Sequence, residues 1–185
     1  MRCFIAIEVP ACITDRLRDL SDRLRQARVR ASWVAPENMH LTLRFLGDIA
    51  DGDATRLGEV LDSRYGNLTP FELTVSGTGA FPNARKPSVI WAGIEPAAGP
   101  LAHVQEIAEE AAQTIGLPRE KRRFHPHLTL ARIRNPEDGK KLLPLLARER
   151  AYEGGAFPVA GVSLFSSRLT PRGAVYTRIR EHAFG

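Results

Sequence analysis

The chain has 185 residues, of which 43% are hydrophobic and 25% are charged, and its formal net charge is +5. This length and composition are those of one globular domain with a sizeable core. The longest apolar runs fall far short of the roughly 20 residues that a transmembrane helix needs, and the first residues lack a signal-peptide cleavage site. We therefore expect a cytoplasmic protein without a membrane span.

Most of the cations are arginine, whose planar guanidinium forms paired hydrogen bonds with phosphate. This composition favours an anionic partner. A well-solvated surface explains a net charge of this modest size about equally well.

Hydrophobic periodicity predicts strands and helices along the whole chain. In chain order, the pattern predicts a strand at 2–9, a helix at 13–24, strands at 33–34 and 39–46, a helix at 53–65, and strands at 71–76 and 88–94 around a loop at 77–87. A helix at 100–115, a strand at 126–133, a helix at 136–150, and strands at 157–169 and 173–180 around a turn at 170–173 follow. Because some strands succeed one another through short connections, we expect an α+β fold with antiparallel pairing rather than a doubly wound parallel sheet.

The tetrapeptide HLTL occurs twice, at residues 40–43 and 127–130. A repeat of four residues has little statistical weight by itself. The two copies begin about half the chain apart, and each lies in a strand that is predicted after a helix. This arrangement favours a pseudo-symmetric fold of two lobes.

Each HLTL copy would present one imidazole and one hydroxyl on the same face of a strand. Alternate side chains of a strand point to the same side, so His40 and Thr42 share a face, as do His127 and Thr129, with the leucines packed behind. If the two lobes face each other, these four polar groups converge in one cleft.

Two histidines in one cleft suit the transfer of a phosphoryl group. Histidine ionises near neutral pH, so one imidazole can remove a proton from an attacking oxygen while the other protonates a leaving oxygen on the opposite side of phosphorus. The threonine hydroxyls can donate to the non-bridging oxygens. This chemistry requires no metal and no cofactor. The pseudo-symmetry leaves open which histidine is the acid.

Two arginines follow the motifs and are candidate phosphate ligands. Arg44 lies two positions after Thr42, so it is expected on the same face, where it would meet phosphate or, as often, form a surface salt bridge. Arg132 is out of phase with Thr129 in an ideal strand. It reaches the cleft only if the strand bends or the side chain crosses the strand edge.

Other interpretations of the histidines compete with a catalytic site. A lone His-x-Thr in a strand is more often a packed histidine, although two matched copies favour a site. His125 and His127 have a spacing that can bind zinc, but residues 122–134 contain no carboxylate and many cations, which argues against a metal. His103 and His182 are expected at the surface.

The motifs and their flanks resemble the 2H phosphoesterases, and within them the RNA 2′,3′-cyclic phosphodiesterases, historically called 2′-5′ RNA ligases. Two His-x-Thr-x motifs half a chain apart are the hallmark of that family. The resemblance covers essentially the whole chain, through RCFIAI at 2–7, WVAPENMHLTLRFLG at 33–47, GAFPN to WAG at 79–93, FHPHLTLAR at 124–132 and the segment 163–176.

The resemblance implies a single 2H phosphoesterase domain over residues 1–185. Its fold would be bilobal, pseudo-symmetric and α+β, with two antiparallel sheets flanked by helices around a central cleft, and each lobe would supply one His-x-Thr-x strand. The implied reaction is metal-independent hydrolysis of RNA 2′,3′-cyclic phosphate ends to 2′-phosphomonoesters, with His40 as proton donor and His127 as proton acceptor. A monomer is expected, acting on RNA ends that include tRNA fragments.

If the substrate is RNA, the basic residues and two aromatic residues are candidates to bind it. Phe81, in the expected loop, and Phe45 are candidates to stack on a terminal base, although Phe45 alternates out of phase with His40 and is expected rather in the core. Two alternatives stay open: joining of RNA ends through a 2′-5′ bond by the reverse reaction, and a basic RNA-binding module without catalysis.

Overall fold

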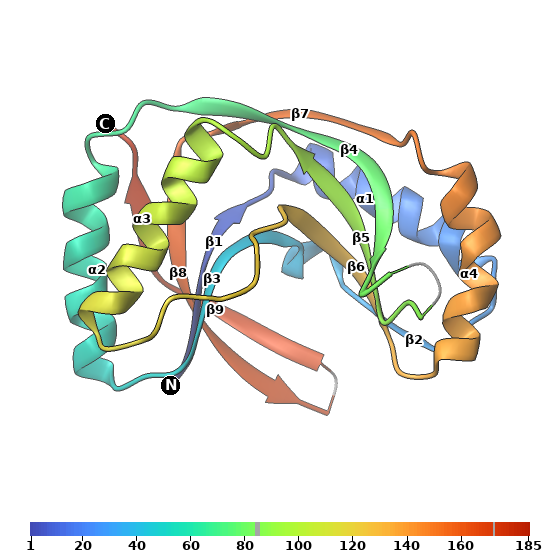
Figure 1. The fold of residues 1–185 in the computed structure, drawn as a ribbon, viewed down its shortest axis with the longest axis horizontal. Coiled ribbons are helices and arrows are strands. Elements are labelled where there is room, and N and C mark those ends of the chain that lie inside the picture. The colour runs from blue at the N-terminus through green and yellow to red at the C-terminus, as the bar shows by residue number, and fades with distance from the viewer. Residues whose placement is uncertain (84–85, 172) are drawn as a thin grey trace.

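The structure is a computed structural model, and it describes residues 1–83, 86–171 and 173–185 (Figure 1). In chain order, the elements are β1 (Arg2–Glu8), α1 (Ala11–Arg25), β2 (Ala31–Trp33), the 3₁₀ helix η1 (Pro36–Asn38), β3 (His40–Asp48), α2 (Asp51–Tyr65), β4 (Phe71–Phe81), β5 (Val89–Glu95), α3 (Pro100–Thr114), β6 (His127–Ile133), α4 (Pro136–Arg148), β7 (Glu153–Val159), β8 (Gly161–Thr170) and β9 (Gly173–Ala183). No described helix is long and apolar enough to cross a membrane.

The strands form one curled antiparallel sheet in the order β7-β4-β5-β6-β3-β1-β8-β9, with β2 added beside β6. β3 and β6 meet at the centre of this sheet, where Leu41 pairs with Leu128. The two expected sheets are therefore the two halves of one continuous sheet. The α+β class with antiparallel pairing is confirmed.

The helices cover the two halves of the sheet in pairs, as Figure 1 shows. α2 and α3 pack together against the half that contains β3 and β9, whereas α1 and α4 pack against the half that contains β6 and β7. α1 directly follows β1 in the chain but packs on the half of the sheet that lacks β1. α3 likewise directly follows β5 but packs on the half that lacks β5. Each half of the sheet, together with its two helices, is thus built from both halves of the sequence.

The core lies between the helices and the sheet. Apolar residues at helical spacing form the buried faces of the helices, namely Ile13, Leu17, Leu20 and Leu24 of α1, Leu57 and Leu61 of α2, and Leu101, Val104, Ile107, Ala108 and Ala111 of α3. Complete burial of one leucine side chain contributes about 1.5–3 kcal/mol to the free energy of folding. These contacts hold α1, α2 and α3 against the sheet.

Two expected elements differ from those observed. β4 continues through Phe81 into the expected loop, because pairing with β5 holds this segment as a strand. The expected strand at 157–169 is two strands, β7 and β8, which lie in opposite halves of the sheet. Ala84 and Arg85 of the expected loop, and Arg172 of the expected turn, lie outside the described residues.

Candidate active site

The four motif side chains lie on one face of the sheet where β3 and β6 meet. With Leu41 opposite Leu128, antiparallel pairing puts His40 across from Thr129, and Thr42 across from His127. The four polar residues are half-buried, whereas the leucines of both motifs are buried on the other face. Among the described residues, neither threonine hydroxyl takes part in a hydrogen bond. Both hydroxyls are therefore free to donate to a bound oxyanion.

Each motif histidine is held by the backbone two residues before it. Nδ1 of His40 lies 2.8 Å from the carbonyl oxygen of Asn38, and Nδ1 of His127 lies 2.6 Å from the carbonyl oxygen of His125. A carbonyl oxygen only accepts, so Nδ1 of each ring donates a proton to it. In the neutral ring, Nε2 then carries the lone pair that can receive or return a proton. The two rings have the same tautomer for the same reason.

The protein environment favours the neutral form of both imidazoles. Burial lowers the pKa of His40 and of His127, and the positive charge of Arg132 lowers both further. The charge of His127 also lowers the pKa of His40, whereas the hydrogen bond to Asn38 opposes the shift. Near neutral pH both imidazoles of the free protein are therefore neutral and can act as bases. For one of them to act as an acid, the negative charge of a bound anion has to raise its pKa.

Aromatic rings from β1 and β9 pack against the imidazole of His40. Phe4 of β1 stacks on the imidazole with a centroid separation of 4.7 Å, and Tyr176 of β9 contacts it edge-on at 5.2 Å. Phe165 of β8 stacks on Phe4 at 5.2 Å and extends this cluster. Sequence reasoning missed these three residues because no local pattern relates β1, β8 and β9 to the first motif.

A second aromatic cluster holds His127. Phe81 contacts the His127 ring edge-on at 4.9 Å, and Trp91 lies 6.3 Å from it. The ring of His125 lies 4.9 Å from Trp91 and 5.2 Å from Phe81. Phe81 therefore lies beside the site, where a residue that stacks on a terminal base would have to lie. It stands at the end of β4 rather than in the expected loop. Trp91 was not among the predicted site residues.

β-bulges change the direction of the arginines that follow the motifs. The pairing of β1 with β3 skips Leu43, and the pairing of β5 with β6 skips Leu130. A bulge inserts one residue, so the side chains after it change faces. Arg132, out of phase in an ideal strand, is thereby turned to the face of Thr129. It is exposed, and its charge acts on both motif histidines.

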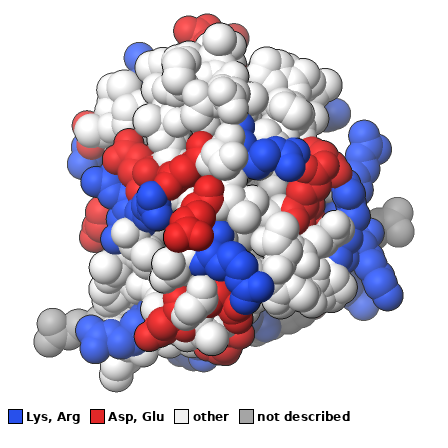
Figure 2. Space-filling view, turned by 90° about the vertical axis from the view of Figure 1, so that its left-hand side faces the viewer, with Lys and Arg blue, Asp and Glu red and all other residues white. Residues whose placement is uncertain are grey.

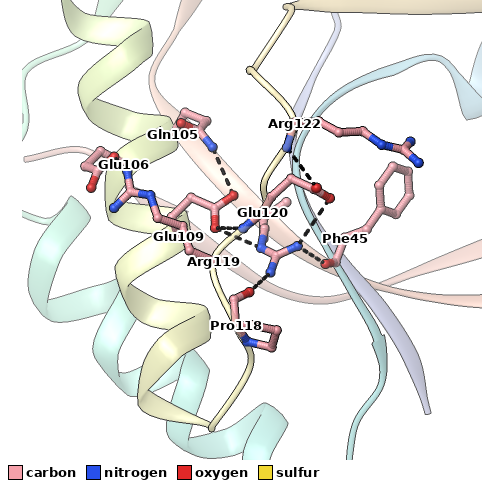
Figure 3. A network of polar contacts seen from close by, with 9 residues as sticks. Phe45, Gln105, Glu106, Glu109, Pro118, Arg119, Glu120 and Arg122 are labelled. Atoms are coloured by element: carbon pink, nitrogen blue, oxygen red, sulfur yellow. Dashed lines mark hydrogen bonds and ion pairs between the residues drawn. The ribbon is translucent and has the colours of Figure 1, made fainter.

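The same shift removes Arg44 from the site, which corrects the expectation that it shares a face with Thr42. The Arg44 side chain is 9% exposed, and its Nε lies 3.1 Å from Oε2 of buried Glu109 in α3. The guanidinium also donates to the carbonyl oxygens of Pro118 (2.5 Å) and Phe45 (3.0 Å) (Figure 3). Arg44 is a structural residue that ties β3 to α3 and to the segment after it.

Phe45 is exposed rather than buried, which corrects the expectation that it lies in the core. Its side chain is 56% exposed, and its ring centroid lies 6.0 Å from that of Phe4, the residue that stacks on His40. Phe45 follows the bulge in β3 as Arg132 follows the bulge in β6. The two motif strands thus present one aromatic ring and one cation at equivalent positions.

His182 is not the surface residue that was expected. It is 1% exposed, and its Nδ1 lies 2.5 Å from Oδ1 of Asp62 in α2. Burial lowers the pKa of His182, and the neighbouring Asp62 opposes that shift. This pair connects the last strand to α2 and lies outside the motif cluster, whereas His103 is exposed, as expected.

The chain matches a family model described as LigT-like phosphoesterase over residues 7–91 and 94–176. This protein belongs to the LigT-like phosphoesterase family. The resemblance to the 2H phosphoesterases is thereby confirmed. The match includes both motif strands and the aromatic residues Phe81, Trp91 and Tyr176, and it begins after Phe4.

Relatives of this LigT-like phosphoesterase match it over nearly their whole length. The RNA 2′,3′-cyclic phosphodiesterase of Methanothermobacter thermautotrophicus is 33% identical over 177 residues, which are 96% of this chain and 95% of that protein. The RNA 2′,3′-cyclic phosphodiesterase of Aeropyrum pernix is 35% identical over 166 residues, which are 90% and 93% of the two chains.

Solved structures share the fold. Protein TT0787 of Thermus thermophilus superposes with a TM-score of 0.83 at 28% identity, covering 99% of this chain and 97% of that one. Escherichia coli LigT in its apo form has a TM-score of 0.78 at 23% identity, covering 99% and 96%. The curled sheet with paired helices is therefore the architecture of the family.

Two cavities flank the motif face of this LigT-like phosphoesterase. One, of about 450 Å³, adjoins the first motif and is lined by residues that include His40, Phe4, Phe165, Tyr176, Glu8 and Asn38. The other, of about 570 Å³, adjoins the second motif and is lined by residues that include Trp91, Gly93, Arg123, His125, Arg150 and Glu95. The first contains carboxylates without arginines, whereas arginines are prominent in the second.

The surplus of positive charge does not gather over α2 and α3. Figure 2 shows acidic and basic side chains interspersed on that face. Several arginines of this face form ion pairs with carboxylates, namely Arg56–Asp53, Arg64–Glu110, Arg119–Glu106 and Arg180–Asp62. A polyanion would meet little net charge there.

Proposed function

We propose that this protein hydrolyses RNA 2′,3′-cyclic phosphate ends to 2′-phosphomonoesters. One observation carries the proposal: two half-buried histidines, each with Nδ1 bonded to a backbone carbonyl, share one face of the sheet with Thr42 and Thr129, whose hydroxyls form no hydrogen bond with any described residue. The relatives from Methanothermobacter and Aeropyrum, which match nearly end to end, are RNA 2′,3′-cyclic phosphodiesterases and support the choice of substrate.

In the proposed reaction the two histidines exchange one proton each with the substrate. Nε2 of His127 accepts a proton from water as the water oxygen bonds to phosphorus. Nε2 of His40, protonated at the start, donates its proton to the 3′ oxygen as the bond from phosphorus to that oxygen breaks. The 2′ phosphoester remains. The donor and acceptor roles follow the resemblance to the 2H phosphoesterases, since the arrangement itself is nearly symmetric.

The remaining polar groups stabilise the charge on phosphorus. Thr42 and Thr129 donate hydrogen bonds to the non-bridging oxygens, and Arg132 supplies a positive charge on the same face. Preorganised donors of this kind act most strongly where aromatic side chains exclude water, as Phe4 and Phe81 do beside the two imidazoles. Arg44 has no part in this scheme, because its guanidinium is held by Glu109.

The proposed reaction uses no metal ion and no cofactor, because the side chains alone supply every proton transfer. Both motifs come from one chain, so we propose that a monomer is sufficient. The proposed substrates are RNA ends that bear a cyclic phosphate, tRNA fragments among them.

Phosphorus NMR of a short RNA with a 2′,3′-cyclic phosphate, incubated with the protein in excess EDTA, tests this function. The proposal predicts conversion to a 2′-phosphomonoester at a rate that added EDTA leaves unchanged. Formation of the 3′-phosphomonoester would overturn the assigned leaving oxygen. Loss of turnover on chelation, restored by a divalent ion, would overturn the metal-free reaction.

A further inference from the structure

The cavity of about 570 Å³ beside the second motif is built on β5. Two of its lining residues, Trp91 and Gly93, pair with Thr129 and His127 across β5 and β6. Trp91 packs on β4 so closely that a Cβ on Gly79 would lie 2.2 Å from the indole ring. The cavity is therefore adjacent to the reacting groups, and a rigid aromatic ring forms part of its wall.

Two arginines line the cavity, and their side chains have no partner among the residues that the structure describes. Arg123 and Arg150 are exposed, and neither forms an ion pair or hydrogen bond through its side chain with any residue that the structure describes. The exposed side chain of His125 adds a polar ring, and Glu95 is the opposing charge on the lining. Two uncommitted guanidinium groups match a phosphodiester, which they can bind through charge-assisted hydrogen bonds.

The segment that carries Arg123 is anchored although it has no regular secondary structure. Arg44 binds the carbonyl oxygen of Pro118, and the backbone N–H of Glu120 donates to Oε2 of Glu109 at 3.1 Å (Figure 3). At its other end the segment enters β6 at His127. The segment 118–126, which carries Arg123, is thus fixed to both motif strands. This limits the conformational entropy that the segment loses when it binds a ligand.

We propose that this cavity is a subsite for the RNA strand beyond its terminal nucleotide. Arg123 and Arg150 contact a phosphodiester there, and the aromatic wall formed by Trp91 and Phe124 offers a base a stacking surface. This inference rests on the proposed function, because the terminal phosphate has to occupy the motif face between His40 and His127. It makes an oligonucleotide a better ligand than a cyclic mononucleotide, which has no second phosphate.

Salt-dependent binding of reaction products tests the subsite without requiring turnover. The probes are a fluorescent RNA trinucleotide with a 2′-phosphate and the corresponding nucleoside 2′-phosphate, titrated at several KCl concentrations. Wild-type protein is expected to bind the trinucleotide about tenfold more tightly or better. In Arg123→Ala and in Arg150→Ala, the trinucleotide should bind several-fold more weakly, and the slope of log K against log salt should fall by about 0.7, the value for one phosphate contact in a single strand.

Arg56→Ala is the matched control, because it removes the same charge from the α2 surface, far from the second motif in the fold. It should keep both the preference for the trinucleotide and the salt slope of wild type. Equal affinity of wild type for the two probes, or wild-type salt slopes in both cavity variants, would overturn the subsite. If the predicted binding is found but cyclic phosphate is not hydrolysed, the subsite stands and the proposed function fails.

Discussion

Leu41 and Leu128 face each other across β3 and β6, and each directly follows a motif histidine. Their pairing places each imidazole across from the threonine of the other strand. Side chains on the diagonal of such a pair have Cα atoms about 7–8 Å apart, which leaves room for a phosphoryl group between the two histidines. The contact between the two strands therefore determines the geometry of the proposed reaction.

Replacement of either motif histidine should nearly abolish turnover. His40→Ala and His127→Ala are each expected to lower kcat by roughly 10²- to 10⁴-fold, because each removes one proton transfer. The double variant should be little slower than the worse single variant, since the two groups act as a unit. Steady-state rates on RNA with a cyclic phosphate end provide the measurement. His103→Ala, on the exposed face of α3, is the control, and full activity in either motif variant would rule out this mechanism.

The threonines should contribute through their hydroxyl groups alone. Thr42→Val and Thr129→Val preserve shape but remove a donor, and each is expected to lower kcat by roughly 10- to 10³-fold. Thr→Ser at the same positions keeps the hydroxyl and should recover most of the rate. If the valine and serine variants were equally slow, packing of the methyl group would be the cause.

The pH profile should show an acid-shifted optimum. Burial lowers the pKa of His40 and of His127, so the acid form of His40 is lost, as pH rises, below its usual pKa of about 6.5. The bell-shaped profile of kcat/KM, which reports the free enzyme, should therefore be centred below about pH 6.5. A bound phosphate favours protonated imidazole, so the profile of kcat should lie at higher pH. Coincident profiles centred above neutrality would contradict this account.

Arg44 and Arg132 should separate stability from catalysis. Arg44→Met leaves the Glu109 carboxylate buried without its partner and is expected to lower the free energy of unfolding by about 3–5 kcal/mol, with part regained when Glu109→Gln is added. Arg132→Met should lower kcat/KM at least tenfold, while the exposed position makes its effect on stability less than about 0.5 kcal/mol. Denaturant unfolding and kinetics on both variants provide the comparison. The reverse pattern would contradict the placement of Arg44 in the structural network and of Arg132 on the motif face.

Most of the elements and the motif pair were predictable from the sequence, because helix faces and alternating strands depend on local periodicity. The directions of Arg44, Phe45 and Arg132 were not. They depend on bulges at Leu43 and Leu130, and nothing in HLTLRF or HLTLAR differs from a regular strand. A single inserted residue reverses every later side chain of a strand, so extrapolation by alternation failed just beyond each motif.

The supporting residues of the site were hidden for a different reason. Phe4, Tyr176 and Trp91 approach the motif histidines from strands that are distant in the sequence, and their positions depend on the order of the strands in the sheet. His182 was likewise placed at the surface because its partner, Asp62, lies in another element. Pairings of this kind become visible only in the folded chain.

A substrate whose 3′ bridging oxygen is replaced by sulfur tests the role of His40 as proton donor, because a thiolate leaves without needing a proton. Rates of His40→Ala and His127→Ala would be measured on the oxygen and sulfur forms of the same cyclic phosphate. His40→Ala is expected to be slow on the oxygen form and close to wild type on the sulfur form, whereas His127→Ala should be slow on both. Rescue of His127→Ala instead, or of neither variant, would contradict the assignment of His40 as proton donor to the 3′ oxygen.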